Sequence, residues 1–188
     1  MLHDAGIAVQ VDAPDIDERA LDDLLDQVGP AALATELARR KAHAVAPRHP
    51  GARVIAADQV GVLVRDGLAR MLTKQPDEDG AVARLMAMSA GTHELLNGVV
   101  VLDVDSGRLA EGVDRQVVTM RHLSDGEVRD YVRRFAPYES AGSYRLEDQE
   151  LMAPLEPFVT GVSGEHDSGV LGMPLPLLRR LLESLESG

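Results

Sequence analysis

Residues Arg53–Leu63 read RVIAADQVGVL, an apolar run that carries the polar pair Asp58-Gln59 in its middle. The small and β-branched residues predict a buried strand over RVIAA that ends at Asp58, followed by a second strand in VGVLVRDGLA with an Asp-Gly turn. A carboxylate within an apolar run costs free energy to desolvate unless it is exposed, hydrogen-bonded or bound to a cation. Asp58 is therefore the first candidate for a chemical role.

Upstream of this stretch the sequence predicts a strand, a loop and a helix. Residues 7–12, IAVQVD, alternate apolar and polar side chains as a half-buried strand does, and the Pro/Asp-rich loop after them ends at Glu18. From Pro30 the run PAALATELARRKAHAVA combines strong helix formers with Pro at a first helical position. Lys41 falls in the C-terminal part of this predicted helix.

Downstream, strands and helices alternate, which predicts the α/β class. DEDGAVARLMAMSAG is predicted as a helix closed by Gly91, and two longer strands after it are joined by an Asp-Ser-Gly turn, so that part of the sheet is antiparallel and the sheet as a whole is mixed. Ser124 and Glu127 have the spacing of a capping box, with a helix to about Phe135. A leucine-rich amphipathic helix closes the chain and is expected to pack in the core or against a second copy, as a homodimer.

Composition limits the class of protein. The 188 residues suit one domain or two small lobes, and the sequence has no apolar run of the length that a membrane span needs, which predicts a cytoplasmic protein with no membrane partner. The formal charge of −12 and the scarcity of aromatic residues oppose binding to a nucleic acid polymer, while a small anionic ligand remains open. There is no cysteine, so disulfides, thiolate metal sites and cysteine nucleophiles are excluded.

Charged residues follow strand or loop signals at four positions, namely Glu18, Lys41, Asp58 and Lys74. Ligands of open α/β sheets bind beyond the carboxyl ends of strands, where two of these residues are expected. Spacing alone is a weak signal, because charged residues on loops are mostly ordinary surface groups.

Six short motifs favour a functional role for these charged residues over a surface role. In chain order they are PDIDE, LARRKA, VIAADQV, TKQPD, AGSY and GVLGMPL. In this order and at these intervals the sequence resembles the Maf family of nucleoside triphosphate pyrophosphatases over nearly its whole length. The resemblance implies a single Maf-like domain over residues 1–188, with a strongly twisted sheet flanked by helices as in Maf and ITPase-like proteins.

The resemblance also implies a reaction, the hydrolysis of a nucleotide between its α- and β-phosphates with help from a divalent cation, Mg²⁺ or Mn²⁺. Asp58 matches the family's proton acceptor, and Glu18 together with Asp58 would hold the cation, which suits Mg²⁺ because it takes few carboxylates plus waters. Lys41 and Lys74 would offset the charge of the triphosphate.

The residue after Asp58 and a residue of the AGSY segment indicate which nucleotide is the substrate. The family branch that resembles 7-methyl-GTP pyrophosphatases has Gln after the Asp and Glu in its AGS(F/Y)xxE segment, and this chain has Gln59 and Glu147 there. The dTTP/UTP branch more often has Thr and Gln. A carboxylate is attracted to the positive charge of N7-methylated guanine. Alternatively, Glu147 is a solvated loop charge, as acidic residues usually are.

The sequence departs from the family pattern at its beginning. Family members open with a strand and an SxSPRR loop that would bind phosphate, whereas MLHDAGIAVQV aligns with the end of the helix after that loop. Either an upstream start codon precedes this sequence or the chain is a natural short form, and the latter leaves open a catalytically silent nucleotide-binding or interaction protein. Gln75 also follows Lys74 where the family has Pro. His93 and His122 lack a metal-ligand spacing and are expected to be structural or surface residues.

Overall fold

The computed structural model describes residues 2–16, 28–65 and 68–186, and these form two compact units. Unit 1 comprises Met1–Val60, Leu96–Gln116 and Gly164–Gly188, and unit 2 comprises Gly61–Leu95 and Val117–Ser163. Each unit therefore draws on separate stretches of sequence. The long strands contribute residues to both units.

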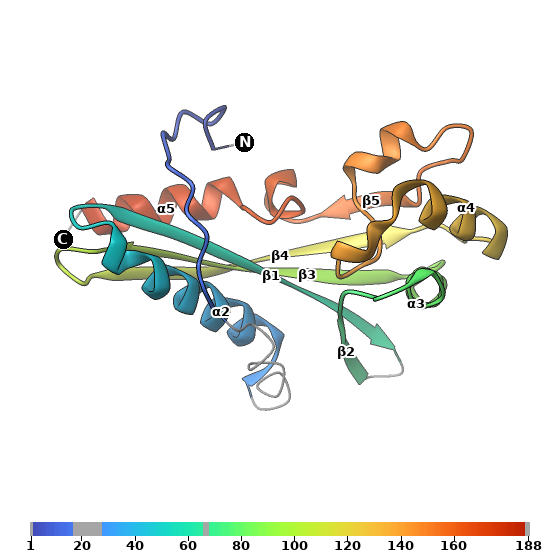
Figure 1. Cartoon of the computed structure of the whole chain (residues 1–188), viewed down its shortest axis with the longest axis horizontal. Helices are drawn as coiled ribbons and strands as arrows, with labels where there is room; N and C mark the ends of the chain where they lie inside the picture. Colours follow the sequence, from blue (N-terminus) through green and yellow to red (C-terminus); the bar gives the residue numbers. More distant parts are fainter. Residues whose placement is uncertain (1, 17–27, 66–67, 187–188) are drawn as a thin grey trace. The chain divides into compact units, whose positions relative to one another are not determined.

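The strands within the described residues form one five-stranded sheet in the order β2-β1-β3-β4-β5 (Figure 1). Their bounds are Arg53–Arg65 for β1, Leu68–Leu72 for β2, Thr92–Asp103 for β3, Leu109–Met120 for β4 and Val159–Ser163 for β5. With its flanking helices this sheet confirms the α/β class. The described strands pair antiparallel, so the expectation of a mixed sheet was wrong for them. A tight turn joins β3 to β4, and two strands joined in this way must run in opposite directions.

Strand β1 does not end at Asp58 as the sequence suggested. It continues through Asp58 and Gln59 to Arg65, and its last residues pair with β2 from Gly61↔Leu72 to Arg65↔Leu68. The two predicted strands are therefore a single strand, and the polar pair lies in its middle. The predicted Asp-Gly turn falls on residues 66–67, outside the described residues.

The predicted turn between β3 and β4 is present. Oδ1 of Asp103 accepts hydrogen bonds from the backbone N–H of Ser106 at 2.9 Å and from its hydroxyl at 2.7 Å. Gly107 follows with a φ of 69°, a conformation that glycine adopts without steric cost. The side-chain chemistry of this turn thus supports the pairing of β3 with β4.

In unit 1, helices α2 (Pro30–Val45) and α5 (Leu175–Glu186) cover opposite faces of the sheet (Figure 1). Successive strand residues point to opposite faces, and two buried clusters reflect this alternation. The cluster under α2 contains Ala38, Ala42, Val54, Ala56, Val100 and Leu102, and the cluster under α5 contains Val99, Val101, Leu177, Leu178, Leu181 and Leu185. The leucines of the final helix therefore pack in the core, one of the two roles expected for them.

Helix α2 approaches β3 closely at Gly98. A Cβ atom added to Gly98 would lie 2.3 Å from the carbonyl carbon of Ala34, a distance that non-bonded atoms do not reach. Only glycine fits at this crossing without moving the helix backbone.

In unit 2, helix α3 (Glu78–Met88) packs against helix α4 (Asp125–Phe135). The capping box is confirmed, because Ser124 accepts from the N–H of Glu127 while the Glu127 side chain accepts from the N–H of Ser124. Tyr131 on α4 stacks on Phe135 and meets the edge of Phe158, and these rings form the aromatic core of the unit.

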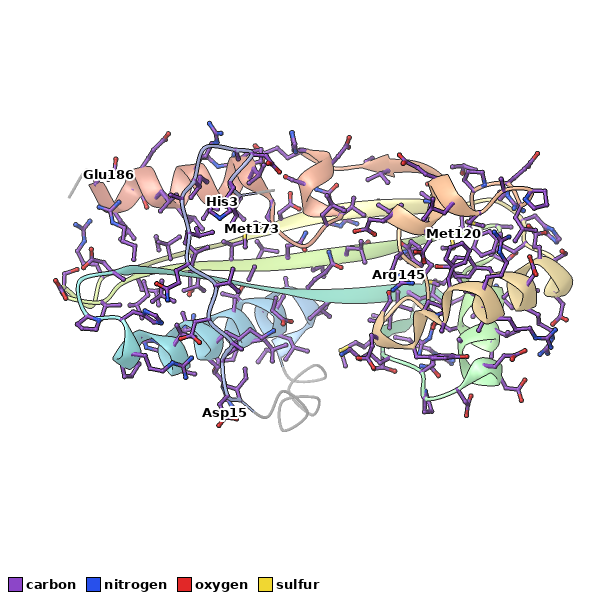
Figure 2. The ribbon with its side chains drawn as sticks, turned by 45° about the horizontal axis from the view of Figure 1, so that its top comes forward. His3, Asp15, Met120, Arg145, Met173 and Glu186 are labelled. Atoms are coloured by element: carbon purple, nitrogen blue, oxygen red, sulfur yellow. The ribbon has the colours of Figure 1, made fainter. Side chains whose placement is uncertain are left out.

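The N-terminal segment, residues 2–16, forms no strand, so the strand expected over residues 7–12 was wrong. The alternation that suggested it is nevertheless visible, because Ile7 and Val9 are half-buried between exposed neighbours. In unit 1 the segment runs from His3 beside α5 to Asp15 on the α2 side (Figure 2). Within the described residues, no helix has the length and apolar character needed to cross a bilayer.

Candidate active site

The structure brings Lys41 and Asp58 together in unit 1. Nζ of Lys41 on α2 lies 2.5 Å from Oδ1 of Asp58 on β1, and the two side chains are 19% and 13% exposed. Each of them also has a further interaction with its surroundings. Because an opposite charge and a hydrogen bond both lower the cost of burying a carboxylate, Lys41 explains why an apolar strand accommodates Asp58.

A pocket of about 840 Å³ opens beside this pair, between the N-terminal segment and the first half of β1. Lys41, His49 and Arg53 line it together with apolar atoms of residues 54–57, Met173 and Leu182. Asp12 also lines it, and hydrogen bonds from His49 and Arg48 lower the pKa of that carboxyl. Pockets of this size and mixed lining accommodate small ligands.

Gln59 is exposed, but its amide is not free. Its Nε2 donates to Oδ1 of Asn97 at 2.9 Å, and Asn97 in turn donates to Oδ2 of Asp114 at 3.0 Å. Gln116 donates to the same Asp114 oxygen at 2.8 Å. The buried polar residues of this cluster, Asn97, Asp114 and Gln116, were not predicted as functional residues.

A signal for this cluster was present in the sequence. Asn97 interrupts the apolar run LLNGVVV, just as Asp58-Gln59 interrupts RVIAADQVGVL, and Asp114 and Gln116 are two residues apart and thus on one face of a strand. Polar residues at such positions must find partners, and here they find each other.

Lys74 and Glu147 belong to unit 2, and both are exposed. Nζ of Lys74 lies 3.1 Å from Oε2 of Glu139, with side-chain exposures of 65% and 90%. Glu147 begins the short 3-10 helix η4 (Glu147–Leu151). At this exposure the Lys74–Glu139 pair contributes little to stability, which leaves Lys74 available to other anions.

The residues around Glu147 are more firmly held. Nε of Arg145, which is labelled in Figure 2, lies 3.0 Å from Oδ2 of Asp148, and the hydroxyl of Tyr131 donates to the same oxygen at 2.6 Å. Burial and the bond to Asp148 raise the pKa of Tyr131. Glu147 is therefore an exposed carboxylate on a segment whose backbone is anchored to the core of unit 2.

The AGSY motif is built around a buried contact between Tyr144 and His93. The hydroxyl of Tyr144 lies 2.8 Å from Nε2 of His93, and burial lowers the pKa of His93 to about 4. Ser143 has a φ of 55°, and its buried hydroxyl has no hydrogen-bond partner among the residues described. His93 thus has the structural role that the sequence predicted, and His122 is exposed.

Glu18, the remaining predicted residue, lies outside the described residues. Within the part of the chain that the structure describes, no group of three or more His, Asp or Glu side chains is placed to hold a metal ion. Asp58 offers a carboxylate in unit 1, and Mg²⁺ is commonly held by one or two carboxylates with substrate phosphates and waters. The carboxylates of Asp58 and Glu18 would fit that pattern.

Comparison with known proteins identifies the relatives of this chain. The family described as Maf-like protein matches residues 1–185. A nucleoside triphosphate pyrophosphatase of Streptomyces coelicolor is 37% identical over 190 residues, which are 100% of this chain and 85% of that protein. A dTTP/UTP pyrophosphatase of Myxococcus xanthus is 38% identical over 97% of this chain and 85% of its own length.

A 7-methyl-GTP pyrophosphatase of Nitrosococcus oceani is also similar, at 31% identity over 95% of this chain and 83% of that protein. The match to the family covers both compact units and includes every residue singled out above. With identities of 31–38% to curated relatives along nearly its whole length, this chain belongs to the Maf family.

Proposed function

We propose that this chain hydrolyses a nucleoside triphosphate between the α- and β-phosphates, releasing the nucleoside monophosphate and pyrophosphate. The observation that carries the proposal is the Lys41–Asp58 pair, two charged side chains held 2.5 Å apart beside a pocket, in a family whose relatives are named for this reaction. Attack of water on a phosphorus surrounded by negative oxygens requires a proton acceptor and charge neutralisation, and the pair offers one group of each kind.

In this proposal Asp58 accepts a proton from the attacking water. Lys41 holds the carboxylate in place, and because an ammonium group has three N–H donors, it can bind Asp58 and a phosphate oxygen together. The family resemblance also gives Lys74 the role of offsetting the charge of the triphosphate. The family resemblance adds a divalent cation, Mg²⁺ or Mn²⁺, held by Asp58 and Glu18, which when bound would offset phosphate charge.

The preferred substrate in this proposal is 7-methyl-GTP. Gln59 and Glu147 occupy the positions that resemble the 7-methyl-GTP branch, and Glu147 is an exposed carboxylate on an anchored segment, available to a cationic base. A second candidate is dTTP or UTP, because the relative of that name is 38% identical to this chain and the 7-methyl-GTP relative is 31% identical.

The test is pyrophosphate release by the purified 188-residue chain with 7-methyl-GTP, GTP, dTTP, UTP, ATP and CTP, in the presence of Mg²⁺ or Mn²⁺. Highest kcat/KM with 7-methyl-GTP is the expected result. Highest kcat/KM with dTTP or UTP would assign the second candidate. Nucleotide binding by calorimetry without turnover of any nucleotide would instead support the catalytically silent protein.

A further inference from the structure

Arg84 on helix α3 is a half-buried cation whose hydrogen-bond partners carry no charge. Its Nη1 donates to the carbonyl oxygen of Met71 at 3.2 Å, and its Nη2 donates to the hydroxyl of Thr73 at 3.3 Å. Among the described residues no carboxylate forms an ion pair with Arg84, and burial lowers the pKa of its guanidinium. A charge that is removed from water is normally compensated by an opposite charge, and Arg84 lacks that compensation.

The acidic side chains at the start of α3 have other partners. Oε1 of Glu78 lies 2.9 Å from Nε of Arg133, and Oδ1 of Asp79 lies 3.3 Å from Nη1 of Arg129. The side chain of Asp77 accepts a backbone N–H as the cap of the helix. Two of these carboxylates thus form ion pairs with α4 rather than with the basic side chain further along α3.

A second cation, Lys74, follows Thr73 directly in the link between β2 and α3 (Figure 1). Nε2 of Gln75 donates to the carbonyl oxygen of Thr73 at 2.8 Å, so side chains hold both the carbonyl and the hydroxyl of that residue. The ion pair of Lys74 with Glu139 joins side chains that are 65% and 90% exposed, and a bound anion can replace such a contact at little cost. Two basic side chains, Lys74 and Arg84, therefore meet one fixed residue of unit 2, and we call this pair the basic corner.

We infer that the basic corner binds a polyphosphate anion, with Arg84 as a binding residue that the family resemblance did not imply. The identity of the anion rests on the proposed function: it is the triphosphate of the nucleotide or the pyrophosphate released from it. A guanidinium group has five N–H donors, so Arg84 can bind phosphate oxygens while it stays fixed to Met71 and Thr73. The anion also supplies the compensating charge that Arg84 lacks, and Lys74 adds a second positive charge.

The direct test is the binding of inorganic pyrophosphate, measured by calorimetry in EDTA. Arg84→Met keeps an unbranched side chain but removes the charge and the donors, so the dissociation constant is expected to rise about 10- to 100-fold, the range for losing a hydrogen bond between charged groups. Arg133→Met is the matched control, since it removes the same charge from unit 2 at a side chain that is 65% exposed and already paired with Glu78. This control is expected to change the constant less than about threefold.

A purely structural role for Arg84, holding Thr73 and through it Lys74, gives a different result in a Lys74→Met background. If Arg84 only positions Lys74, Arg84→Met adds nothing once the lysine is absent. If Arg84 binds the anion itself, Arg84→Met weakens binding further in that background. The more highly charged inorganic triphosphate is the probe for this comparison, and circular dichroism confirms the folding of each variant.

Three results would overturn the inference: no binding of pyrophosphate or triphosphate by the parent chain, equal effects of Arg84→Met and Arg133→Met, or no added effect of Arg84→Met in the Lys74→Met background. None of these measurements requires turnover, so the proposed function is decided separately. If the chain hydrolyses no nucleotide but binds pyrophosphate through Arg84, the proposed function fails and the basic corner remains an anion-binding site. If the chain hydrolyses nucleotides and Arg84→Met binds pyrophosphate as the parent chain does, the proposed function holds and the inference is rejected.

Discussion

The ammonium group of Lys41 and the carboxylate of Asp58 form an ion pair at 2.5 Å between helix α2 and the middle of strand β1. The pair compensates the charge of a carboxylate that is 13% exposed, which allows β1 to continue past it to Arg65. It also keeps two candidate catalytic groups in contact within unit 1. The strand and the proposed chemistry therefore depend on the same interaction.

Asp58→Asn is expected to lower kcat by at least about 10²-fold, the low end for a positioned acid–base group, because the amide keeps the shape but loses the basicity. The measurement is steady-state pyrophosphate release, with circular dichroism to confirm folding. Asp79→Asn is the matched control, since it removes a carboxylate that is 91% exposed in unit 2. Turnover by Asp58→Asn close to that of the control would remove Asp58 from the mechanism.

Glu147→Gln is expected to reduce the preference for 7-methyl-GTP over GTP by about 5- to 150-fold, equivalent to about 1–3 kcal/mol, because attraction to the charge of the methylated ring is lost while size is retained. The quantity to compare is the ratio of the two kcat/KM values. Glu150→Gln, an exposed residue of the same short helix, is the control. If the two variants give the same ratio, Glu147 is a solvated surface charge.

His93 makes the stability of the protein depend on pH. Burial lowers the pKa of folded His93 from 6.5 to about 4, so within this window the unfolded chain binds a proton that the folded chain does not. The stabilising effect of burying neutral His93 is fully present above the unfolded pKa and is lost as pH falls, by about 3 kcal/mol in total. Denaturant unfolding of the parent chain and of His93→Gln across this range would measure it, and the difference in unfolding free energy between the two should change with pH. Parallel curves would contradict a buried neutral histidine.

Helix α4 offers a pair of substitutions with opposite expected effects. Ser124→Ala removes the N-terminal cap and is expected to lower the unfolding free energy by about 1 kcal/mol. Gly126→Ala, in the first turn, adds a methyl group to open space and is expected to raise it by about 0.5–1 kcal/mol. Chemical denaturation of the two variants beside the parent chain is the measurement. Changes of the same sign would contradict the described start of this helix.

Local signals predicted most of the elements correctly. Pro at the start of α2, the Ser124–Glu127 capping box and the Asp-Ser-Gly turn each act within a few residues. The local structure that they produce can therefore be predicted from residues close in sequence. The strand over residues 7–12 was wrong because alternation reports which side chains are buried, while a strand also requires a pairing partner. The break at Asp58 was wrong for a related reason, since its partner Lys41 is 17 residues away.

By itself the sequence determined the α/β class, the helix starts, the Maf resemblance and the residues Lys41, Asp58 and Gln59 as candidates, because these depend on local propensity and on the order of short motifs. Only the tertiary structure decided which of them touch. It paired Lys41 with Asp58 and connected Gln59 through Asn97 to Asp114, residues separated by 38 and 17 positions along the chain. Such contacts arise because buried polar groups must form hydrogen bonds with partners on neighbouring strands and helices. The separation of two residues along the sequence does not predict which of them become partners.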